Sequence, residues 1–422
     1  MIDSRTEWLG KVPENWRVTT IASLYTLRNE KVSDKDFPPL SVTMKGIVPQ
    51  LDSAAKTDDG DNRKLVRIGD FAINSRSDRR GSCGISAFDG SVSLINTVLT
   101  PRGDMHPGYY NWLFHSVAFA DEFYRWGHGI VADLWTTRWQ EMKRILVPNP
   151  SMEEQSAIAA YLDNQCAQID SIIEEARASI EEYKEWKAAI IFEAVTKGLD
   201  RDAEKRDSGI PWIGSIPKKW TTCAIKRLTT KIGSGKTPSG GAEVYTDEGV
   251  IFLRSQNVYD TGLVLDDVSH ISDEIDAEMK NTRVQYRDVL LNITGGSIGR
   301  CCIFDMKDTR ANVNQHVCIL RTNEKELLPE FLRYFWISAC GPIVVGQYQT
   351  GGNRAGLNFE QIGKVKIPYC TIHEQRGIVQ YLDEKCEVIN GLITEKENLL
   401  SDLEAYKRSL IYEAVTGKRK VV

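Results

Sequence analysis

The sequence has 422 residues, of which 41% are hydrophobic and 26% charged, and its formal net charge is −5 at pH 7. This length exceeds one ordinary domain, and the composition is that of a globular protein rather than a fibrous or disordered one. No apolar run approaches the roughly 20 residues that span a bilayer, and Met1–Arg5 does not open a signal peptide, so we expect a cytoplasmic protein. The nine cysteines form no C-x-x-C pair, which favours neither a disulfide framework nor a metal site.

A first globular block is expected over residues 1–150. It opens with the pattern Trp8-x-Gly10-x-x-Pro13-x-x-Trp16, and its densest group of basic residues lies between Arg76 and Ser82. Lysine and arginine are balanced by acidic residues in this block, so the net charge neither excludes nor supports a nucleic-acid partner.

A long helix is expected over residues 151–200. Apolar residues recur every three or four positions from Ile158 to Ala194, no proline interrupts them, and Ser151-x-x-Glu154 has the pattern of a capping box. A helix of about 45 residues is roughly 65 Å long, at about 1.5 Å per residue.

A second globular block is expected over residues 201–370. It repeats the opening pattern as Trp212-x-Gly214-x-x-Pro217-x-x-Trp220. Short aliphatic runs bounded by turn residues predict strands at 250–253, 289–293 and 317–320, and residues 332–338 after Pro329 predict a helix. Both blocks are therefore interpreted as α+β.

A second long helix is expected over residues 371–422. Residues 154–198 and 374–418 align without a gap, and Thr371-x-x-Glu374 repeats the capping box. Two helices with matching apolar stripes are expected to pair as an antiparallel coiled coil. The order block, helix, block, helix is that of an internal duplication with pseudo-two-fold symmetry.

The whole chain resembles the DNA-specificity subunits of Type I restriction–modification systems. The resemblance is carried by Gly209–Gly214, Gly235-Lys236-Thr237-Pro238, Gly295–Gly299, Asn312–His316 and the paired Glu-Gln…Tyr-Leu-Asp helices. It implies two target-recognition domains, each reading one half of a split asymmetric DNA site. It also implies that the helices set the spacing and dock two methyltransferase subunits, which restriction subunits join. The first block lacks the Gly-x-Thr-Pro and Asn-Gln-His runs.

Other chemistries find little support in the sequence. Gly233–Thr237 ends like a phosphate-binding loop, but Thr230 stands where the first glycine belongs and Pro238 opposes the helix that should follow. A methyltransferase would need an Asn/Asp-Pro-Pro-Tyr site, whereas this chain has Ile367-Pro368-Tyr369. We expect no catalytic residue, no metal and no cofactor, so the enzymatic activities must come from partners.

Candidate DNA contacts are loop residues with guanidinium, ammonium, hydroxyl or amide groups that can reach phosphates or base edges. They are Arg63, Lys64, Arg76, Arg79, Arg80, Lys236, Thr237, Arg254, Gln256, Asn257, Arg300 and Arg354. Asn314-Gln315-His316 is interpreted either as a base-reading run or as buried hydrogen-bonding groups. The partner surface is expected on the outer, charged faces of the helices, at residues such as Glu174 and Lys396. Two alternatives stay open: a self-contained restriction endonuclease with a degenerate nuclease site, and a purely structural coiled-coil scaffold.

Overall fold

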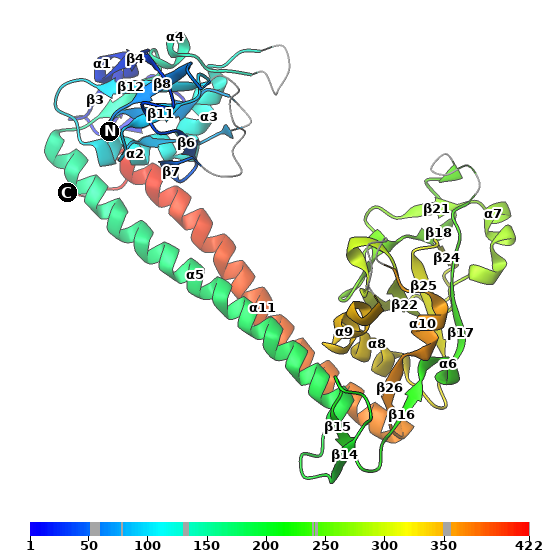
Figure 1. The fold of residues 1–422 in the computed structure, drawn as a ribbon. Coiled ribbons are helices and arrows are strands. Elements are labelled where there is room, and N and C mark those ends of the chain that lie inside the picture. The colour runs from blue at the N-terminus through cyan, green and yellow to red at the C-terminus, as the bar shows by residue number, and fades with distance from the viewer. Residues whose placement is uncertain are drawn as a thin grey trace. The chain divides into compact units, whose positions relative to one another are not determined.

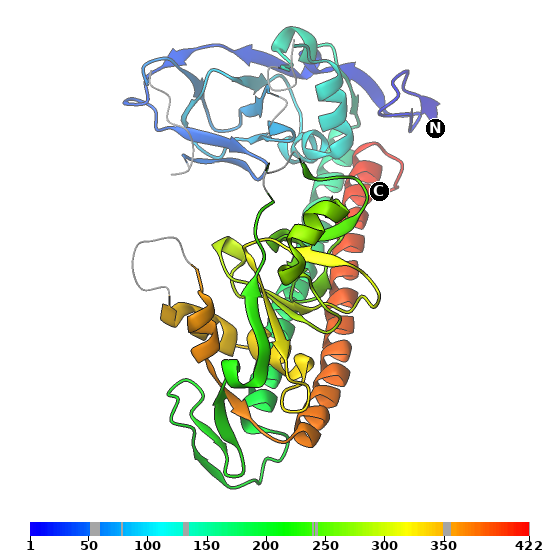
Figure 2. The ribbon, with the colours of Figure 1, turned by 90° about the vertical axis from the view of Figure 1, so that its right-hand side faces the viewer.

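The computed structural model describes residues 1–50, 60–76, 79–129, 135–238, 240, 244–348 and 356–421. They form two compact units, of which unit 1 comprises residues 1–177 and 397–422 and unit 2 comprises residues 178–396. Both ends of the chain belong to unit 1 (Figures 1 and 2). Each unit contains one globular block and parts of both long helices.

The globular part of unit 1 is built on a four-stranded antiparallel sheet in the order β10-β9-β12-β4. These strands are β4 (Tyr25–Arg28), β9 (Phe71–Asn74), β10 (Cys83–Ile85) and β12 (Asn96–Pro101). A three-stranded sheet has the order β11-β8-β5, with β5 (Lys31–Val32), β8 (Arg63–Val66) and β11 (Gly90–Val92). Further strand pairs are β1 (Ile2–Asp3) with β2 (Lys11–Val12), β3 (Arg17–Thr20) with β13 (Leu146–Asn149), and β6 (Leu40–Thr43) with β7 (Gly46–Pro49).

Aromatic side chains bind the helices of unit 1 to its four-stranded sheet. The helices are α1 (Ile21–Leu24), α2 (Pro107–His115), α3 (Val117–Arg125) and α4 (Trp139–Met142). The ring centroids of Phe71 on β9 and Phe114 on α2 are 4.7 Å apart, and Phe114 lies 4.6 Å from Phe119 on α3. All three side chains are fully buried, so the helices and the sheet share one core.

The globular part of unit 2 repeats this plan. Its four-stranded sheet has the order β17-β25-β22-β23, with β17 (Thr229–Ser234), β22 (Val289–Asn292), β23 (Cys301–Ile303) and β25 (Val317–Thr322). A second sheet has the order β21-β18-β24, with β18 (Val250–Leu253), β21 (Ser269–Ile271) and β24 (Ala311–Val313), and here β18 and β24 are parallel. The strand pairs are β14 (Lys205–Asp207) with β15 (Ser215–Pro217), β16 (Thr221–Ala224) with β26 (Lys366–Tyr369), and β19 (Val258–Tyr259) with β20 (Gly262–Leu263).

The helices of unit 2 are α6 (Ile225–Leu228), α7 (Asp273–Glu278), α8 (Pro329–Ile337), α9 (Cys340–Tyr348) and α10 (Phe359–Lys364). One of them, α8, lies where the sequence predicted a helix, and the others had not been predicted. Helix α8 packs on β23 as α2 packs on β10, through buried residues such as Phe331 and Phe335. The strands and the helix that the sequence predicted in this block are therefore confirmed.

The two long helices are α5 (Met152–Lys197) and α11 (Ile372–Val415), which agree with the predicted segments. Both predicted capping boxes form: Glu154 accepts hydrogen bonds from the backbone N–H and hydroxyl of Ser151, and Glu374 accepts them from Thr371. A helix of 46 residues without a proline is stable because its apolar stripe is covered by the other long helix.

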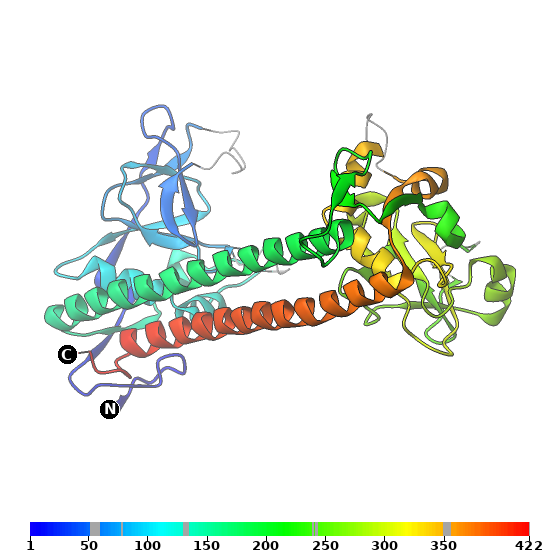
Figure 3. The ribbon, with the colours of Figure 1, turned by 90° about the horizontal axis from the view of Figure 1, so that it is seen from below.

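The helices pair side by side and antiparallel within each unit (Figure 3). In unit 1, Lys407 Nζ on α11 donates to Asp170 on α5 at 2.5 Å, and Glu404, one turn earlier, accepts from Arg177, further along α5. In unit 2, Lys187 Nζ donates to Asn390 Oδ1 at 2.7 Å. The predicted stripe residues fill the space between the helices: Ile169 and Ile173 are buried in unit 1, and Leu382 and Ile389 in unit 2.

Candidate nucleic-acid interface

In unit 2 the strand order brings several predicted polar segments to one edge of the fold. Strands β18 and β24 are parallel and paired from Ile251–Ala311 to Leu253–Val313, so the segments that follow them leave the sheet together. Asn292 at the end of β22 pairs with Val317 at the start of β25, and Ser234 at the end of β17 pairs with Cys318. The loops after β17, β18, β22 and β24 therefore meet at this edge, which we call the unit 2 edge.

A chain of hydrogen bonds connects three of these loops. Thr237 Oγ1 donates to Gln315 Oε1 at 2.5 Å, and Gln315 Nε2 lies 3.0 Å from His316 Nε2. His316 Nδ1 is in turn hydrogen bonded to Thr294 Oγ1 at 2.6 Å. Because Gln315 is exposed and held on both sides, its amide presents a fixed donor and acceptor to solvent.

The arginines at this edge lie over tyrosine rings. The guanidinium of Arg254 is 5.6 Å from the ring centroid of Tyr245, and that of Arg300 is 4.6 Å from Tyr259. Both arginines are partly exposed, although the Nε atom of Arg254 is itself buried and has no hydrogen-bond partner among the described residues. Stacking on a ring orients a guanidinium while leaving its donors available for phosphates or base edges. Lys236 and Gln256 are exposed at the same edge.

Asn257 does not belong to this set. Its side chain is 2% exposed, its Oδ1 accepts from the backbone N–H of Arg254, and its Nδ2 donates to the carbonyl of Val264. Both ends of the amide are used to close the turn after β18. Asn257 is therefore buried in this turn and is not among the groups exposed at the unit 2 edge.

In unit 1 the loop between β9 and β10 occupies the place of the β22–β23 loop of unit 2. It carries Arg76, Arg79 and Arg80, which are all exposed. Arg80 donates to Asp121 at 2.5 Å, and its guanidinium lies 4.4 Å from the ring centroid of Tyr124, which stacks on Trp135. A cluster of three arginines beside two aromatic rings forms a cationic edge with apolar faces, which we call the unit 1 edge.

Arg63 and Lys64 face inwards instead. Arg63 is 4% exposed, and it donates through Nε to Ser91 Oγ at 2.8 Å and through Nη2 to the Ser91 carbonyl at 3.0 Å. Lys64 Nζ donates to the carbonyl of Asn96 at 2.6 Å, and burial lowers the pKa of its ammonium. Both side chains tie β8 to neighbouring segments. The expectation that Arg63 is exposed is wrong, whereas Lys64 is partly exposed and its contact with DNA remains a prediction. Arg354 lies outside the described residues.

Four aromatic residues at the two edges were missed by the sequence reasoning. Tyr124 and Trp135 accompany Arg80, while Tyr245 and Tyr259 accompany Arg254 and Arg300. The three tyrosines lie 9, 41 and 44 positions from their arginines along the chain, so no local pattern connects a tyrosine with its arginine. Only the tertiary structure pairs them.

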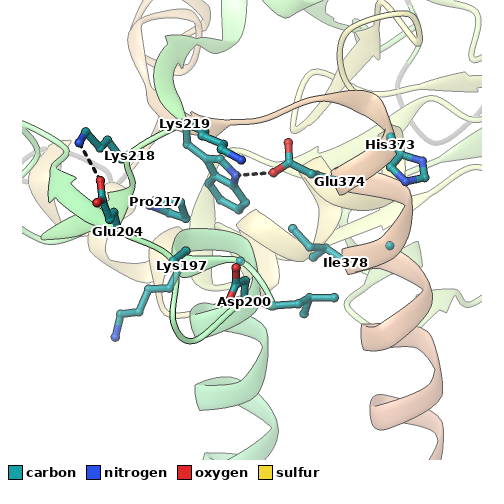
Figure 4. A pocket seen from close by; sticks show the side chains of 14 residues that line it. Lys197, Asp200, Glu204, Pro217, Lys218, Lys219, His373, Glu374 and Ile378 are labelled. Atoms are coloured by element: carbon teal, nitrogen blue, oxygen red, sulfur yellow. Dashed lines mark hydrogen bonds and ion pairs between the residues drawn. The ribbon is translucent and has the colours of Figure 1, made fainter.

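The repeated Trp-Gly-Pro-Trp pattern forms a junction between the two long helices in each unit. In unit 1, Trp16 Nε1 donates to Glu154 at 3.0 Å, and in unit 2, Trp220 Nε1 donates to Glu374 at 3.1 Å (Figure 4). Burial opposes ionisation of both carboxyls, but the hydrogen bonds from the indole and the capping residue outweigh it, so the pKa of each is lowered. Gly417 and Gly198, with φ of +71° at the ends of α11 and α5, pack against the same two tryptophans.

Within the described ranges, no group of three histidine, cysteine or acidic residues is placed to hold a metal ion. The same part of the chain contains no helix that is both long and apolar enough to cross a membrane.

Comparisons with known proteins agree with this architecture. The family model described as "Type I restriction modification DNA specificity domain" matches residues 217–401. The specificity subunit of the Type I restriction enzyme EcoBI from Escherichia coli is 25% identical over 283 residues, which cover 65% of this chain and 58% of that protein. The chain thus spans less than two thirds of the length of this curated relative.

Two solved structures share the fold. A chain from a structural study of the assembly and conformational transition of the type I R-M system matches with a TM-score of 0.76 and 14% identity, covering 97% of this chain and 100% of that one. The crystal structure of the HsdS subunit from Thermoanaerobacter tengcongensis matches with a TM-score of 0.53 and 15% identity, covering 97% and 98%. The family model thus identifies residues 217–401 as a domain of this kind, and the two solved structures share the fold of the chain.

Proposed function

We propose that this chain is the DNA-reading, non-catalytic subunit of a Type I restriction–modification complex. Residues 1–150 and 201–370 act as two target-recognition domains, each reading one half of a bipartite asymmetric site. The observation that carries the proposal is the pair of edges, because two equivalent sheets carry loops with different arginine, amide and aromatic groups. A duplicated scaffold with different edges suits a protein that reads two different half-sites.

The chemistry of the edges supports contact with double-stranded DNA. Arginine can bind guanine through two parallel hydrogen bonds, and a glutamine amide can bind adenine in the same way. The guanidinium groups at the unit 1 edge are those of Arg76, Arg79 and Arg80. At the unit 2 edge they are those of Arg254 and Arg300, and Gln256 supplies an exposed amide. Lys236 and Thr237 suit phosphate contacts.

The remaining functions belong to partners. Two methyltransferase subunits dock on the duplicated helical scaffold, the helices set the spacing between the half-sites, and restriction subunits join the complex in the cytoplasm. The repeated Trp–Glu junctions support this stoichiometry, because a repeated surface can bind two copies of one protein. The alternative of a self-contained endonuclease receives no support from the comparisons.

A modified-base map of DNA tests the function. DNA methylated by the methyltransferase with this chain should carry one split motif, which should be absent when this chain is omitted. The single variants Arg80→Ala and Arg254→Ala should each relax one half of the motif and leave the other half unchanged. Losing one good bidentate contact should cost about 1–3 kcal/mol of discrimination.

The control is Arg408→Ala, because Arg408 is an exposed arginine on α11, away from both edges. It should leave both half-sites unchanged. The proposal fails if methylation is independent of this chain, or if both edge variants alter the same half-site. Cleavage of DNA by the purified chain with magnesium alone would favour the endonuclease alternative.

A further inference from the structure

One short connection between strands has the same backbone arrangement in both units. Residues 93–95 join β11 to β12, and residues 314–316 join β24 to β25. The backbone N–H of the residue after each connection donates to the first carbonyl of the connection, at 3.0 Å in unit 1 and 3.4 Å in unit 2. That same residue is paired with the last residue of β9 or of β22. We call the two connections the unit 1 turn and the unit 2 turn.

Both turns belong to the edges that carry the exposed arginines. Ser75 follows β9 and precedes Arg76, and its backbone N–H donates to the carbonyl of Ile95 in the unit 1 turn at 3.3 Å. Ile293 follows β22, and its backbone N–H donates to the carbonyl of His316 in the unit 2 turn at 3.0 Å. The two turns therefore occupy equivalent places at the unit 1 edge and the unit 2 edge.

The exposed side chains of the two turns differ in their chemistry. In the unit 2 turn Gln315 is exposed and His316 partly exposed, whereas Asn314 is buried and accepts from the backbone N–H of His316. At the positions equivalent to Gln315 and His316, the unit 1 turn has Leu94 and Ile95, which are 40% and 37% exposed. One backbone thus presents an amide in one unit and two aliphatic side chains in the other.

The amide of Gln315 is held in place and still has one donor and one acceptor to offer. Its Oε1 accepts from the hydroxyl of Thr237 and its Nε2 lies 3.0 Å from Nε2 of His316, so each atom keeps one further bonding site. In the major groove adenine presents the acceptor N7 beside the donor N6, which complements an amide, whereas guanine presents two acceptors. The unit 2 turn therefore suits an adenine.

We propose that these turns determine part of the sequence specificity of the two domains. Gln315 reads an adenine in one half-site, and Leu94 with Ile95 contacts the methyl group of a thymine in the other. Aliphatic side chains pack against that methyl group, but they leave the polar edges of guanine and cytosine without hydrogen-bond partners. The proposal rests on the function proposed above and names bases and reading residues beyond the arginines.

An adenine analogue tests the unit 2 turn. Each adenine of the methylated motif is replaced, one at a time, by 7-deazaadenine, which lacks the N7 acceptor. One replacement should weaken binding of the duplex to the complex of this chain with the methyltransferase by about tenfold. Gln315→Leu should abolish that difference. The control Gln285→Leu should retain it, because Gln285 is exposed but precedes β22, and the unit 2 edge lies at the other end of that strand.

A thymine analogue tests the unit 1 turn. Deoxyuridine lacks the methyl group of thymine, and replacing one thymine in the other half of the motif should weaken binding about fourfold, as expected for one apolar carbon. The double variant Leu94→Ala, Ile95→Ala should abolish this difference. The control Ile68→Ala should retain it, because Ile68 is exposed but precedes β9, at the far end from the unit 1 edge.

The outcomes separate this assignment from the proposed function. If the turn variants bind every duplex more weakly by one common factor, the turns only support the loops and the assignment is wrong. It is equally wrong if no replacement affects the wild type, or if both effects fall in the same half of the motif. In each of these cases a split motif that still depends on this chain leaves the proposed function intact, whereas methylation without the chain would overturn both.

Discussion

The hydrogen bond between Trp220 and Glu374 should stabilise the first turns of helix α11 against local opening. Glu374→Ala removes the capping-box partner of Thr371, which costs about 1 kcal/mol. It also leaves Trp220 Nε1 without its acceptor in a side chain that is 2% exposed, which costs about 1–3 kcal/mol. The two effects together should lower the free energy of local opening by about 2–4 kcal/mol.

Amide hydrogen exchange measures this opening directly. Each 1.36 kcal/mol is a factor of ten, so the protection of amides from Gln375 to Leu382 should fall at least about 30-fold. The control is Glu384→Ala, which removes an exposed glutamate of the same helix and should change protection by less than about 0.5 kcal/mol.

A second substitution separates the two effects. Trp220→Phe removes the indole donor that Glu374→Ala leaves without an acceptor. It should therefore lower the free energy of local opening by about 1–2 kcal/mol less in the Glu374→Ala background than in the wild type. If Glu374→Ala is indistinguishable from Glu384→Ala, or if Trp220→Phe costs the same in both backgrounds, the Trp220–Glu374 hydrogen bond does not stabilise the start of α11.

Two further predictions concern charged groups. Asp288 is 1% exposed and accepts two hydrogen bonds from Arg321, at 2.8 and 2.7 Å, so Asp288→Ala should lower the free energy of unfolding of unit 2 by about 3 kcal/mol. Chemical denaturation measures this change. The exposed Asp273–Arg310 pair is the control, and Asp273→Ala should lower the free energy of unfolding by less than about 1 kcal/mol. Because the pKa values of Glu154 and Glu374 are lowered by folding, their contribution to stability is present above the ordinary value of 4.5 and is lost as the pH falls through the folded values. Melting temperatures between pH 7 and pH 3 should therefore decline below about pH 4.5, and the decline should be smaller in a Glu154→Gln, Glu374→Gln variant.

The long helices could be predicted from the sequence because their signals are local. An apolar residue every three or four positions and a capping box at each start depend on neighbours within one or two turns. The bounds of α5 and α11 agree with these signals to within a few residues. The duplicated tryptophans were also visible, but their bonds to Glu154 and Glu374 join positions 138 and 154 residues apart.

The candidate site was only partly predictable, because exposure is decided by tertiary structure. Arg76, Arg79, Arg80 and Arg254 do lie on loops at sheet edges, as the turn-rich sequence suggested. Arg63 is a charged residue in a short strand, and its burial depends on Ser91, which is 28 positions away. Residue type alone predicts that Asn257 is exposed, yet both ends of its amide are hydrogen bonded within the turn after β18. The sequence of the first block has diverged from that of the second, and no local pattern in it predicted the strand order.

The division of the chain into units also has a consequence for the order of folding during synthesis. Unit 2 is one continuous stretch, residues 178–396, whereas unit 1 needs residues 397–421 to complete its core. Tyr109, for example, donates its hydroxyl hydrogen to the carbonyl of Val415, 306 residues later. At roughly 5–20 residues per second, a ribosome needs about 15 to 60 seconds to make the residues between them. The first globular block therefore emerges before unit 2 but completes its core after it, and for that interval the apolar side chains that Leu410, Ile411 and Val415 cover remain open to solvent.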